Sequence, residues 1–240
     1  MNKQLVKNLS SYFTCTESLF DKQNVSVVCV KNDRVKLACG QNGLLAVSTN
    51  SGVIIQADSV YCQELKNIYE GYNKLDFFEA NNLSLLESLV REFDKMLSGP
   101  YLVLHKFKPN LGLINNDHNL RIELKTTNNS DLFQYEGFDN ALSYQENNRD
   151  EYTLILWSKH QPVAIATATQ LHLELYSIGI NVLPQWRRKN IGLLALSKLT
   201  EAILNKGKIP HYSVSIANTA SINLALKAGY STSYCTVYTV

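Results

Sequence analysis

Residues 174–230 decide the fold, and they read ELYSIGINVLPQWRRKNIGLLALSKLTEAILNKGKIPHYSVSIANTASINLALKAGY. Ile178 to Val182 is an apolar run with a central glycine, which predicts a buried strand. Pro184 ends this strand, because proline has no N–H to donate to a neighbouring strand. A basic turn from Trp186 to Gly192 then runs into a strongly helical sequence. The stretch therefore predicts a strand, a tight turn, a helix, another strand and a second helix.

The basic turn has the features of an anion-binding site. The first turn of any helix leaves about four backbone N–H groups without a partner, so the groups from Arg188 to Leu193 are expected to point outward. Asn190 tolerates a left-handed conformation, and Gly192 permits a close approach to the backbone. These properties suit a diphosphate. A solvated basic helix start without any ligand explains the turn alone equally well.

The composition restricts the class of protein. The chain has 240 residues, of which 45% are hydrophobic and 18% are charged, as in an ordinary globular protein. Its formal net charge is only +2, and the positive charge is concentrated locally, between Arg187 and Lys189. A general nucleic-acid binder usually carries a broad basic stripe. We therefore expect no nucleic-acid partner, and a nucleic-acid or protein-binding role for the turn ranks last among the alternatives.

The cysteines and the N-terminus predict a cytoplasmic protein. Five cysteines stand at positions 15, 29, 39, 62 and 235, an odd number without a CxxC pair or a His/Cys cluster. They predict reduced, mostly buried thiols, and neither a metal site nor a disulfide framework. The N-terminal residues show no signal peptide, and no segment approaches the roughly 18 apolar residues that cross a membrane. We expect no membrane association.

The first part of the chain, residues 1–115, is predicted to be a smaller α+β domain. Its expected elements are a helix within 1–20, strands at 24–30, 34–39, 44–48 and 53–57, turns at 41–43 and 50–52, and helices at 61–72 and 83–97. Gly99 and Pro100 are expected to close the last helix. A strand at 101–107 follows, in which His105 is expected to be a partly exposed residue rather than a ligand.

The polar segment 108–119 is the expected domain boundary, and residues 116–240 form the second predicted domain. Its expected elements are strands at 120–124, 152–157, 163–168 and 171–182, one or two short helices within 131–144, and an alternating C-terminal tail at 231–240. Together with residues 174–230, these segments give the order β-α-β-β-β-α-β-α-β. The whole chain is therefore predicted to be α+β.

Two motifs in residues 174–230 resemble the GNAT N-acetyltransferase superfamily. The first is its acyl-CoA signature, here Val182-Leu183-Pro184 followed by Arg187 to Gly192, with Asn190 at the position of the first glycine. The second marker has the spacing of Asn218, Ser221, Leu224, Gly229 and Tyr230. The chain looks most like the branch with an additional N-terminal domain. Whether residues 1–115 are a diverged GNAT-like half is left open.

The resemblance implies a fold, an activity and a cofactor. The fold is a central mixed, mostly antiparallel sheet flanked by helices. The activity is that of an N-acetyltransferase that uses acetyl-CoA as acyl donor, and the acceptor is the amine of a small molecule or peptide, which attacks directly in a ternary complex. The cofactor-binding residues implied are Ile180, Asn181, Val182, Arg187, Arg188, Lys189, Asn190, Ile191, Gly192, Leu193, Asn218 and Ser221.

The catalytic residues are less evident, because two positions depart from the family pattern. Ser177 stands where many members carry a glutamate, and Ala225 where many carry a tyrosine. We take Glu174 and Tyr234 as the candidates. In a regular strand Glu174 faces the other side from Ser177, so a bulge would have to re-aim it. A module that binds CoA without turnover is the open alternative, and a homodimer is also left open.

Overall fold

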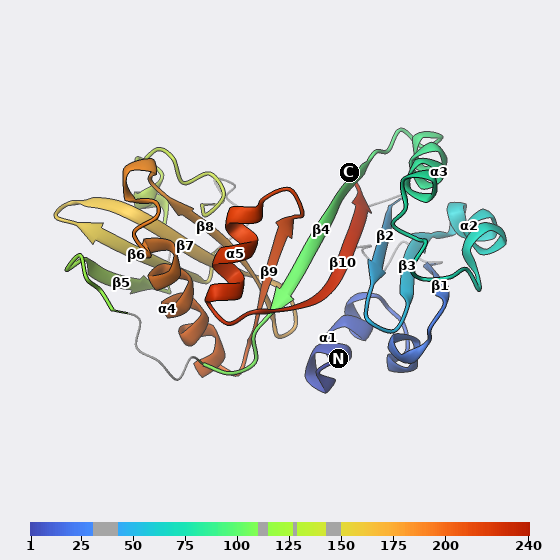
Figure 1. Cartoon of the computed structure of the whole chain (residues 1–240), viewed down its shortest axis with the longest axis horizontal. Helices are drawn as coiled ribbons and strands as arrows, with labels where there is room; N and C mark the ends of the chain where they lie inside the picture. Colours follow the sequence, from blue (N-terminus) through green and yellow to red (C-terminus); the bar gives the residue numbers. More distant parts are fainter. Residues whose placement is uncertain (31–42, 110–114, 127–128, 143–149) are drawn as a thin grey trace. The chain divides into compact units, whose positions relative to one another are not determined.

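The computed structural model describes residues 1–30, 43–109, 115–126, 129–142 and 150–240. The chain divides into two compact units (Figure 1). The N-terminal unit is Met1–Val103 with Ser233–Val240, and the C-terminal unit is Leu104–Thr232. Strands β4 (Leu97–His105) and β10 (Ser231–Thr239) carry the chain across this division. The division into domains at residues 115 and 116 stays a prediction.

The N-terminal unit is built on a sheet with the strand order β1-β3-β2-β10-β4. Its other elements are α1 (Lys3–Tyr12), η1 (Glu17–Asp21), β1 (Val25–Val30), β2 (Leu44–Ser48), β3 (Val53–Asp58), η2 (Ser59–Tyr61), α2 (Cys62–Tyr69) and α3 (Ala80–Arg91). β1 and β3 are parallel, whereas β2 is antiparallel to both β3 and β10. The predicted strand at 34–39 and most of the turn at 41–43 lie outside the described residues.

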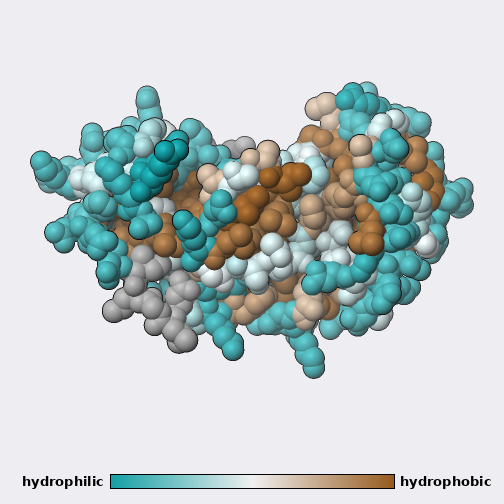
Figure 2. All heavy atoms as spheres, viewed as in Figure 1, coloured by the Kyte–Doolittle hydropathy of each residue, from teal (hydrophilic) through white to brown (hydrophobic). Residues whose placement is uncertain are grey.

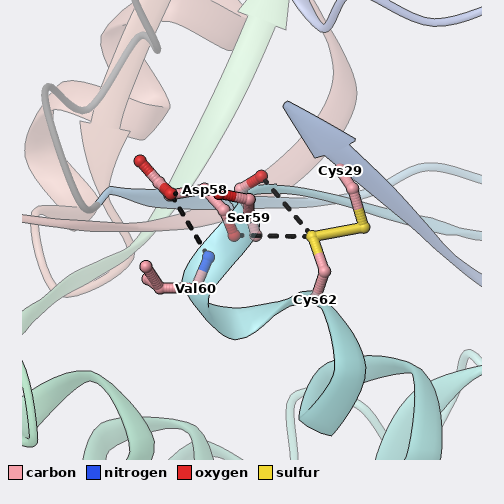
Figure 3. Close-up of a disulfide and its surroundings, with 6 residues drawn as sticks. Cys29, Asp58, Ser59, Val60 and Cys62 are labelled. Atoms are coloured by element: carbon pink, nitrogen blue, oxygen red, sulfur yellow. Dashed lines mark hydrogen bonds between the residues drawn. A yellow bond between two sulfur atoms is a disulfide. The ribbon is translucent and has the colours of Figure 1, made fainter. Parts of the chain in front are cut away.

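A disulfide joins β1 to the first residue of α2 (Figure 3). Cys29 and Cys62 are 33 residues apart in the sequence, and their Cα atoms are 5.8 Å apart. The prediction that the thiols are reduced is therefore wrong for this pair. The two residues meet because Cys29 lies beside Ala57 in the β1–β3 ladder, and the short turn η2 follows directly. That long-range pairing is not visible in the cysteine spacing. Cys15 and Cys235 are free thiols.

The C-terminal end of α3 differs from the prediction that Gly99 and Pro100 close this helix. Asp94 takes the left-handed conformation instead, with φ of 55°. The N–H of Lys95 then donates to Val90 O at 3.2 Å, which is the bond that closes a Schellman-type helix end. The helix is therefore terminated before the glycine is reached, and Gly99 and Pro100 belong to β4.

The C-terminal unit has the strand order β9-β8-β7-β6-β5. Its elements are β5 (Arg121–Lys125), η3 (Ser130–Leu132), β6 (Tyr152–Ser158), β7 (Gln161–His172), β8 (Leu175–Val182), η4 (Pro184–Trp186), α4 (Ile191–Asn205), β9 (Ile209–Ser215) and α5 (Thr219–Lys227). The neighbours from β5 to β8 are antiparallel, and β8 and β9 are parallel. The predicted mixed, mostly antiparallel sheet is confirmed.

The two faces of this sheet are covered differently. α4 crosses β6 to β9 on one face (Figure 1). On the other face, side chains from the segment 129–142 pack against alternate residues of β6 and β7. This second core contains Leu132, Phe138, Ala141, Leu142, Ile155, Trp157 and Ile165. The helices predicted within 131–144 are replaced in the described residues by the 3₁₀ turn η3, while 143–149 lie outside them.

The segment predicted as one strand at 171–182 is divided between β7 and β8. Leu173 has φ of 44°, so the chain reverses at the turn that Leu173 and Glu174 form. A register shift between Gln170 and His172 accompanies the turn. The alternating apolar residues on both sides of it look continuous in the sequence, since a two-residue reversal leaves little trace in periodicity.

Hydrophobic residues gather over α5 and the neighbouring end of β9 (Figure 2). Ile216 and Leu226 are two exposed apolar side chains of this part of the chain. Ala225 of α5 and Ala228, which follows the helix, are both fully buried. α5 therefore lies close to its neighbours, and the position where many family members carry a tyrosine is packed inward.

Candidate active site

Two parallel strands separate within the C-terminal unit. β8 and β9 are paired at three positions, the last of which joins Ser177 to His211. Beyond it β8 continues to Val182 and β9 to Ser215, and the described residues contain no further pair between them. Part of the β8 edge that faces β9 is therefore left without a ladder.

Alternation along β8 shows which backbone groups face the gap. Ile209 N donates to Glu174 O at 2.7 Å, so the even-numbered residues of β8 direct their N–H and C=O groups toward β9. The parallel pair of Ser177 with His211 uses the N–H of Ile178, so Ile180 and Val182 are the even-numbered residues left beyond the ladder. An extended chain laid along this edge would add to the sheet as a strand does.

The three β8 residues predicted to bind the extended arm of the cofactor have different positions. Ile180 and Val182 face the gap, whereas the backbone of Asn181 faces β7. The side-chain Oδ1 of Asn181 accepts the N–H groups of Asn140 at 2.9 Å and Ala141 at 2.8 Å. Asn181 therefore fixes the loop that lies over β8 on the face opposite α4.

The start of α4 presents a run of backbone donors. The N–H groups of Arg187 and Leu194 donate to backbone carbonyls at 3.2 and 3.0 Å. For the six residues between them, Arg188 to Leu193, the described structure gives no acceptor for the N–H group. Arg188 and Asn190 have φ of 59° and 58°. Left-handed residues that alternate with ordinary ones turn successive N–H groups into one concave nest, which binds anions.

The basic side chains of this turn are held in different ways. Arg187 Nε donates to Val182 O at 3.0 Å, so this guanidinium covers the last carbonyl of β8. Lys189 Nζ lies 5.2 Å from the centre of the Trp186 ring, a cation–π distance. Arg188 is exposed beside the nest. The charge of the turn therefore surrounds the backbone donors.

Helix packing around position 192 does not require a glycine. A Cβ placed there would meet Leu224 Cδ2 and Val182 Cγ2 at 3.4 Å, which is ordinary van der Waals contact. The first turn of α4 thus lies against both β8 and α5. The apolar stripe by which α4 packs on the sheet is buried, and includes Ile191, Ala195, Leu199 and Ile203.

The second marker lies at the start of α5. Asn218 Oδ1 accepts the N–H of Ser221 at 3.1 Å and so caps the helix. Ser221 Oγ lies 2.7 Å from Tyr212 OH of β9. Burial raises the pKa of Tyr212, although the hydrogen bond with Ser221 opposes this shift. The hydroxyl of Tyr212 therefore stays protonated, one residue beyond the point where β8 and β9 separate.

The two candidate catalytic residues lie in different units of the chain. Glu174 stands in the turn before β8, at the opposite end of that strand from Val182. Tyr234 is buried in the part of β10 that belongs to the N-terminal unit, and burial raises its pKa. Their catalytic roles stay predictions.

A buried histidine pair was missed by the sequence analysis. His105 Nε2 lies 3.1 Å from His211 Nδ1. His105 is fully buried, so the prediction that it is partly exposed is wrong. Burial lowers the pKa of His211 to about 4, and burial and the proximity of His211 lower that of His105. The residues are far apart in the sequence, and only the placement of the end of β4 beside β9 brings them together.

A cavity of about 510 Å³ lies over β7 and β8, and its lining includes Ser177, the last β8 residue that pairs with β9. Its walls come from the loop 139–142, from residues 167–171 of β7 and from residues 177–179 of β8. Asp150 completes the lining and is only 7% exposed. The sequence does not mark Asp150 as a site residue, since an isolated aspartate in a polar turn belongs to no motif.

A model of the GNAT acetyltransferase family matches residues 103–239, which is more than half of the chain. The chain belongs to this family. The acetyltransferase domain covers β8, the donor nest of α4 and the marker of α5, so the resemblance drawn from residues 174–230 is confirmed. A search of curated proteins returned no match.

Three solved structures are similar to this acetyltransferase. A GCN5-related N-acetyltransferase-like protein from Streptococcus suis has 16% identity and a TM-score of 0.51, over 82% of this chain and 83% of that one. A GNAT-family protein from Novosphingobium aromaticivorans has 12% identity and a TM-score of 0.49, over 60% and 71%. A GCN5-related N-acetyltransferase from Kribbella flavida has 14% identity and a TM-score of 0.46, over 64% and 62%. At this identity the likeness to the Streptococcus suis protein shows the fold alone.

The described residues of the acetyltransferase contain no helix that is both long enough and apolar enough to cross a bilayer. Among the same residues, no group of three or more histidine, cysteine, aspartate or glutamate side chains is placed to hold a metal ion.

Proposed function

We propose that this acetyltransferase transfers the acetyl group of acetyl-CoA to an amine, by direct attack within a ternary complex. The observation that carries the proposal is the nest of six N–H donors, Arg188 to Leu193, beside the unpaired edge of β8. A diphosphate fits such a nest at a helix start, because the donors and the helix dipole both favour negative charge. The residues present therefore suit the diphosphate and the extended arm of one ligand.

Each part of the site has a distinct binding role in this proposal. The nest and the exposed Arg188 hold the pyrophosphate. The backbone of Ile180 and the N–H of Val182 pair with the pantetheine arm, since the Val182 carbonyl is already covered by Arg187. Asn218 and Ser221 support the site from the start of α5, and Asn181 shapes the opposite wall through the loop that it holds.

The chemistry needs few protein groups. When bound, acetyl-CoA supplies a thioester whose carbon the neutral amine attacks, so that a C–N bond forms, the C–S bond breaks and CoA leaves as a thiol. A backbone N–H of the unpaired part of β8 is the donor that we assign to the developing oxyanion. The protonated hydroxyl of Tyr212 is the proton donor for the leaving sulfur in this proposal, in place of Tyr234. The amine loses its proton to water at the Ser177 side of the gap.

Isothermal titration calorimetry with two donors tests the cofactor site. Acetyl-CoA should bind, and S-acetylpantetheine, which lacks the pyrophosphate, should bind at least ~100-fold more weakly, because several charge-assisted hydrogen bonds are lost. Equal affinity for the two donors would contradict the assignment of the nest. Absence of acetyl-CoA binding at high micromolar concentration would refute the proposed function.

Thiol release with a panel of amines then tests turnover. Release of CoA that depends on an added amine supports the transferase reaction. Binding of acetyl-CoA without release by any amine of the panel would favour the alternative, a module that keeps the CoA site and has lost catalysis. Ser177 and Ala225, which replace a carboxylate and a hydroxyl of the family pattern, are the residues that motivate this alternative.

A further inference from the structure

The cavity at the Ser177 end of the gap has a fixed wall. A Cβ on Gly179 would lie 2.1 Å from Asn140 O, so the loop rests directly on the backbone of β8. Thr167 Oγ1 donates to Ala141 O from β7, and Asn181 holds the same loop from β8. Three independent contacts thus fix the loop on the sheet. The cavity is therefore a built feature of the C-terminal unit.

The cavity is lined by an oriented, buried carboxylate. Asn129 Nδ2 donates to Asp150 Oδ2 at 2.8 Å, and Thr169 Oγ1 donates to Asp150 Oδ1 at 2.7 Å. Both donors are neutral. A carboxylate can accept about four hydrogen bonds, so each oxygen of Asp150 keeps a further site for a ligand.

Among the described residues, no positively charged side chain neutralises the charge of the cavity. Asp150 and Asp139 are the charged side chains among its described lining residues, and both are acidic. None of the salt bridges that the described residues form involves Asp150. A buried carboxylate is costly without a positive partner. A cation bound in the cavity would supply that partner.

The position of Asp150 relative to the gap limits the kind of cation. Thr169, which donates to Asp150, is the partner of Ser177 in the β7–β8 ladder. Ser177 is also the last β8 residue paired with β9, and hence marks the start of the gap. The carboxylate therefore lies beside β7, about one strand spacing (roughly 5 Å) from β8, the strand that borders the gap. A group held at Asp150 leaves room for another part of the same molecule to reach the gap.

We propose that this cavity binds the acceptor, and that the acceptor is a small amine with a second, cationic group held by Asp150. The inference rests on the proposed function and adds the substrate class. The charged group is anchored by Asp150, and the polar side chains of Thr169, Gln170 and Ser177 line the path toward the gap. The neutral end of the molecule is the nucleophile.

Three acceptors of matched length test the proposal: 1,4-diaminobutane, 1-aminobutane, and 4-aminobutanoate. The first two differ only by the second ammonium, and the third replaces it by a carboxylate. In thiol-release assays with acetyl-CoA, kcat/KM should be about 10- to 100-fold higher for the diamine than for 1-aminobutane, the range that a hydrogen bond to a charged group supplies. The value for 4-aminobutanoate should be the lowest. Calorimetry of the three amines in the presence of CoA should rank their affinities in the same order, and no turnover occurs under these conditions.

The variant Asp150→Asn keeps the shape of the side chain and removes its charge. It should abolish most of the preference for the diamine, mainly through KM, and leave the Kd of acetyl-CoA unchanged. Asp131→Asn is the matched control, since Asp131 is an exposed carboxylate paired with Lys125 outside the cavity. Thermal unfolding of both variants shows whether the fold is kept.

The outcomes separate this inference from the proposed function. If acetyl-CoA does not bind, both fail. If acetyl-CoA binds and the diamine has no advantage over 1-aminobutane in rate or in affinity, the acceptor inference alone is refuted. The same holds if 4-aminobutanoate is preferred, or if Asp150→Asn behaves like Asp131→Asn. Absence of turnover and of diamine binding, with acetyl-CoA binding intact, also refutes it.

Discussion

Substitutions of Arg188 distinguish what its backbone conformation contributes to the nest from what its charge contributes. Its φ of 59° costs a residue with a side chain about 1 kcal/mol, which glycine does not pay. Arg188→Gly should therefore be more stable than Arg188→Ala by about 1 kcal/mol in thermal or urea unfolding. Because exposed charges contribute only about 0–1 kcal/mol, both variants should lose at most ~5-fold in acetyl-CoA affinity. A loss of two orders of magnitude in both would assign the binding to the guanidinium.

The pair of His105 and His211 makes stability depend on pH. The pKa of His211 is about 4 in the folded chain and ordinarily 6.5, so between these values the unfolded chain binds more protons. The free energy of unfolding should stay level above pH 6.5 and fall as pH decreases toward 4, by up to about 3 kcal/mol for His211. The lowered pKa of His105 acts in the same direction. Urea unfolding at pH 7, 6 and 5 measures the slope.

Substitutions identify the source of that slope. His211→Gln should flatten the fall between pH 6.5 and 5, because one of the two buried imidazoles no longer excludes a proton. His160→Gln is the control, since His160 is exposed in the turn between β6 and β7. An unchanged slope in His211→Gln would show that other groups cause the pH dependence.

The contact between β8 and its covering loop can be tested by a single methyl group. In Gly179→Ala the new Cβ would lie 2.1 Å from Asn140 O, so the loop 139–142 must move. We expect a loss of about 1–3 kcal/mol in the free energy of unfolding, and a larger rise in KM for the amine than for acetyl-CoA. Gly192→Ala is the comparison for stability, since its Cβ meets Leu224 at an ordinary 3.4 Å. Equal stability of the two variants would contradict the packing argument.

At the scale of helices and strands, the sequence predicted the features that depend on local interactions. The helical sequence after the basic turn predicted α4, and the end of the stretch 174–230 predicted α5 as a second helix. The separation of β8 from β9 after Ser177, by contrast, depends on pairing between strands, and nothing within either strand signals it. Asp150 belongs to the candidate site because Thr169 of β7 donates a hydrogen bond to its carboxylate. Such features come from tertiary packing, which periodicity does not contain.

In the whole molecule, the disulfide and the candidate site lie in different units. Cys29 and Cys62 belong to the N-terminal unit, while the nest, the gap and the cavity belong to the C-terminal unit. A cross-link that closes a loop of this length restricts the unfolded chain and stabilises its unit by about 4 kcal/mol. Reduction should therefore weaken the N-terminal unit selectively. Hydrogen exchange with and without a reductant should show faster exchange in β1, β3 and α2, and unchanged exchange in β7 and α4.

Binding of acetyl-CoA provides a second test of whether the candidate site is independent of the disulfide in the N-terminal unit. The double variant Cys29→Ser with Cys62→Ser should bind acetyl-CoA with the Kd of the original chain, at a temperature where its N-terminal unit is still folded. Cys15→Ser is the control, because Cys15 is a free thiol of the same unit. Burial raises the pKa of Cys15 to about 11, so this thiol should resist alkylation at neutral pH in the oxidised and the reduced protein. A fall in acetyl-CoA affinity on reduction, matched by the double variant, would show that the N-terminal unit supports the cofactor site.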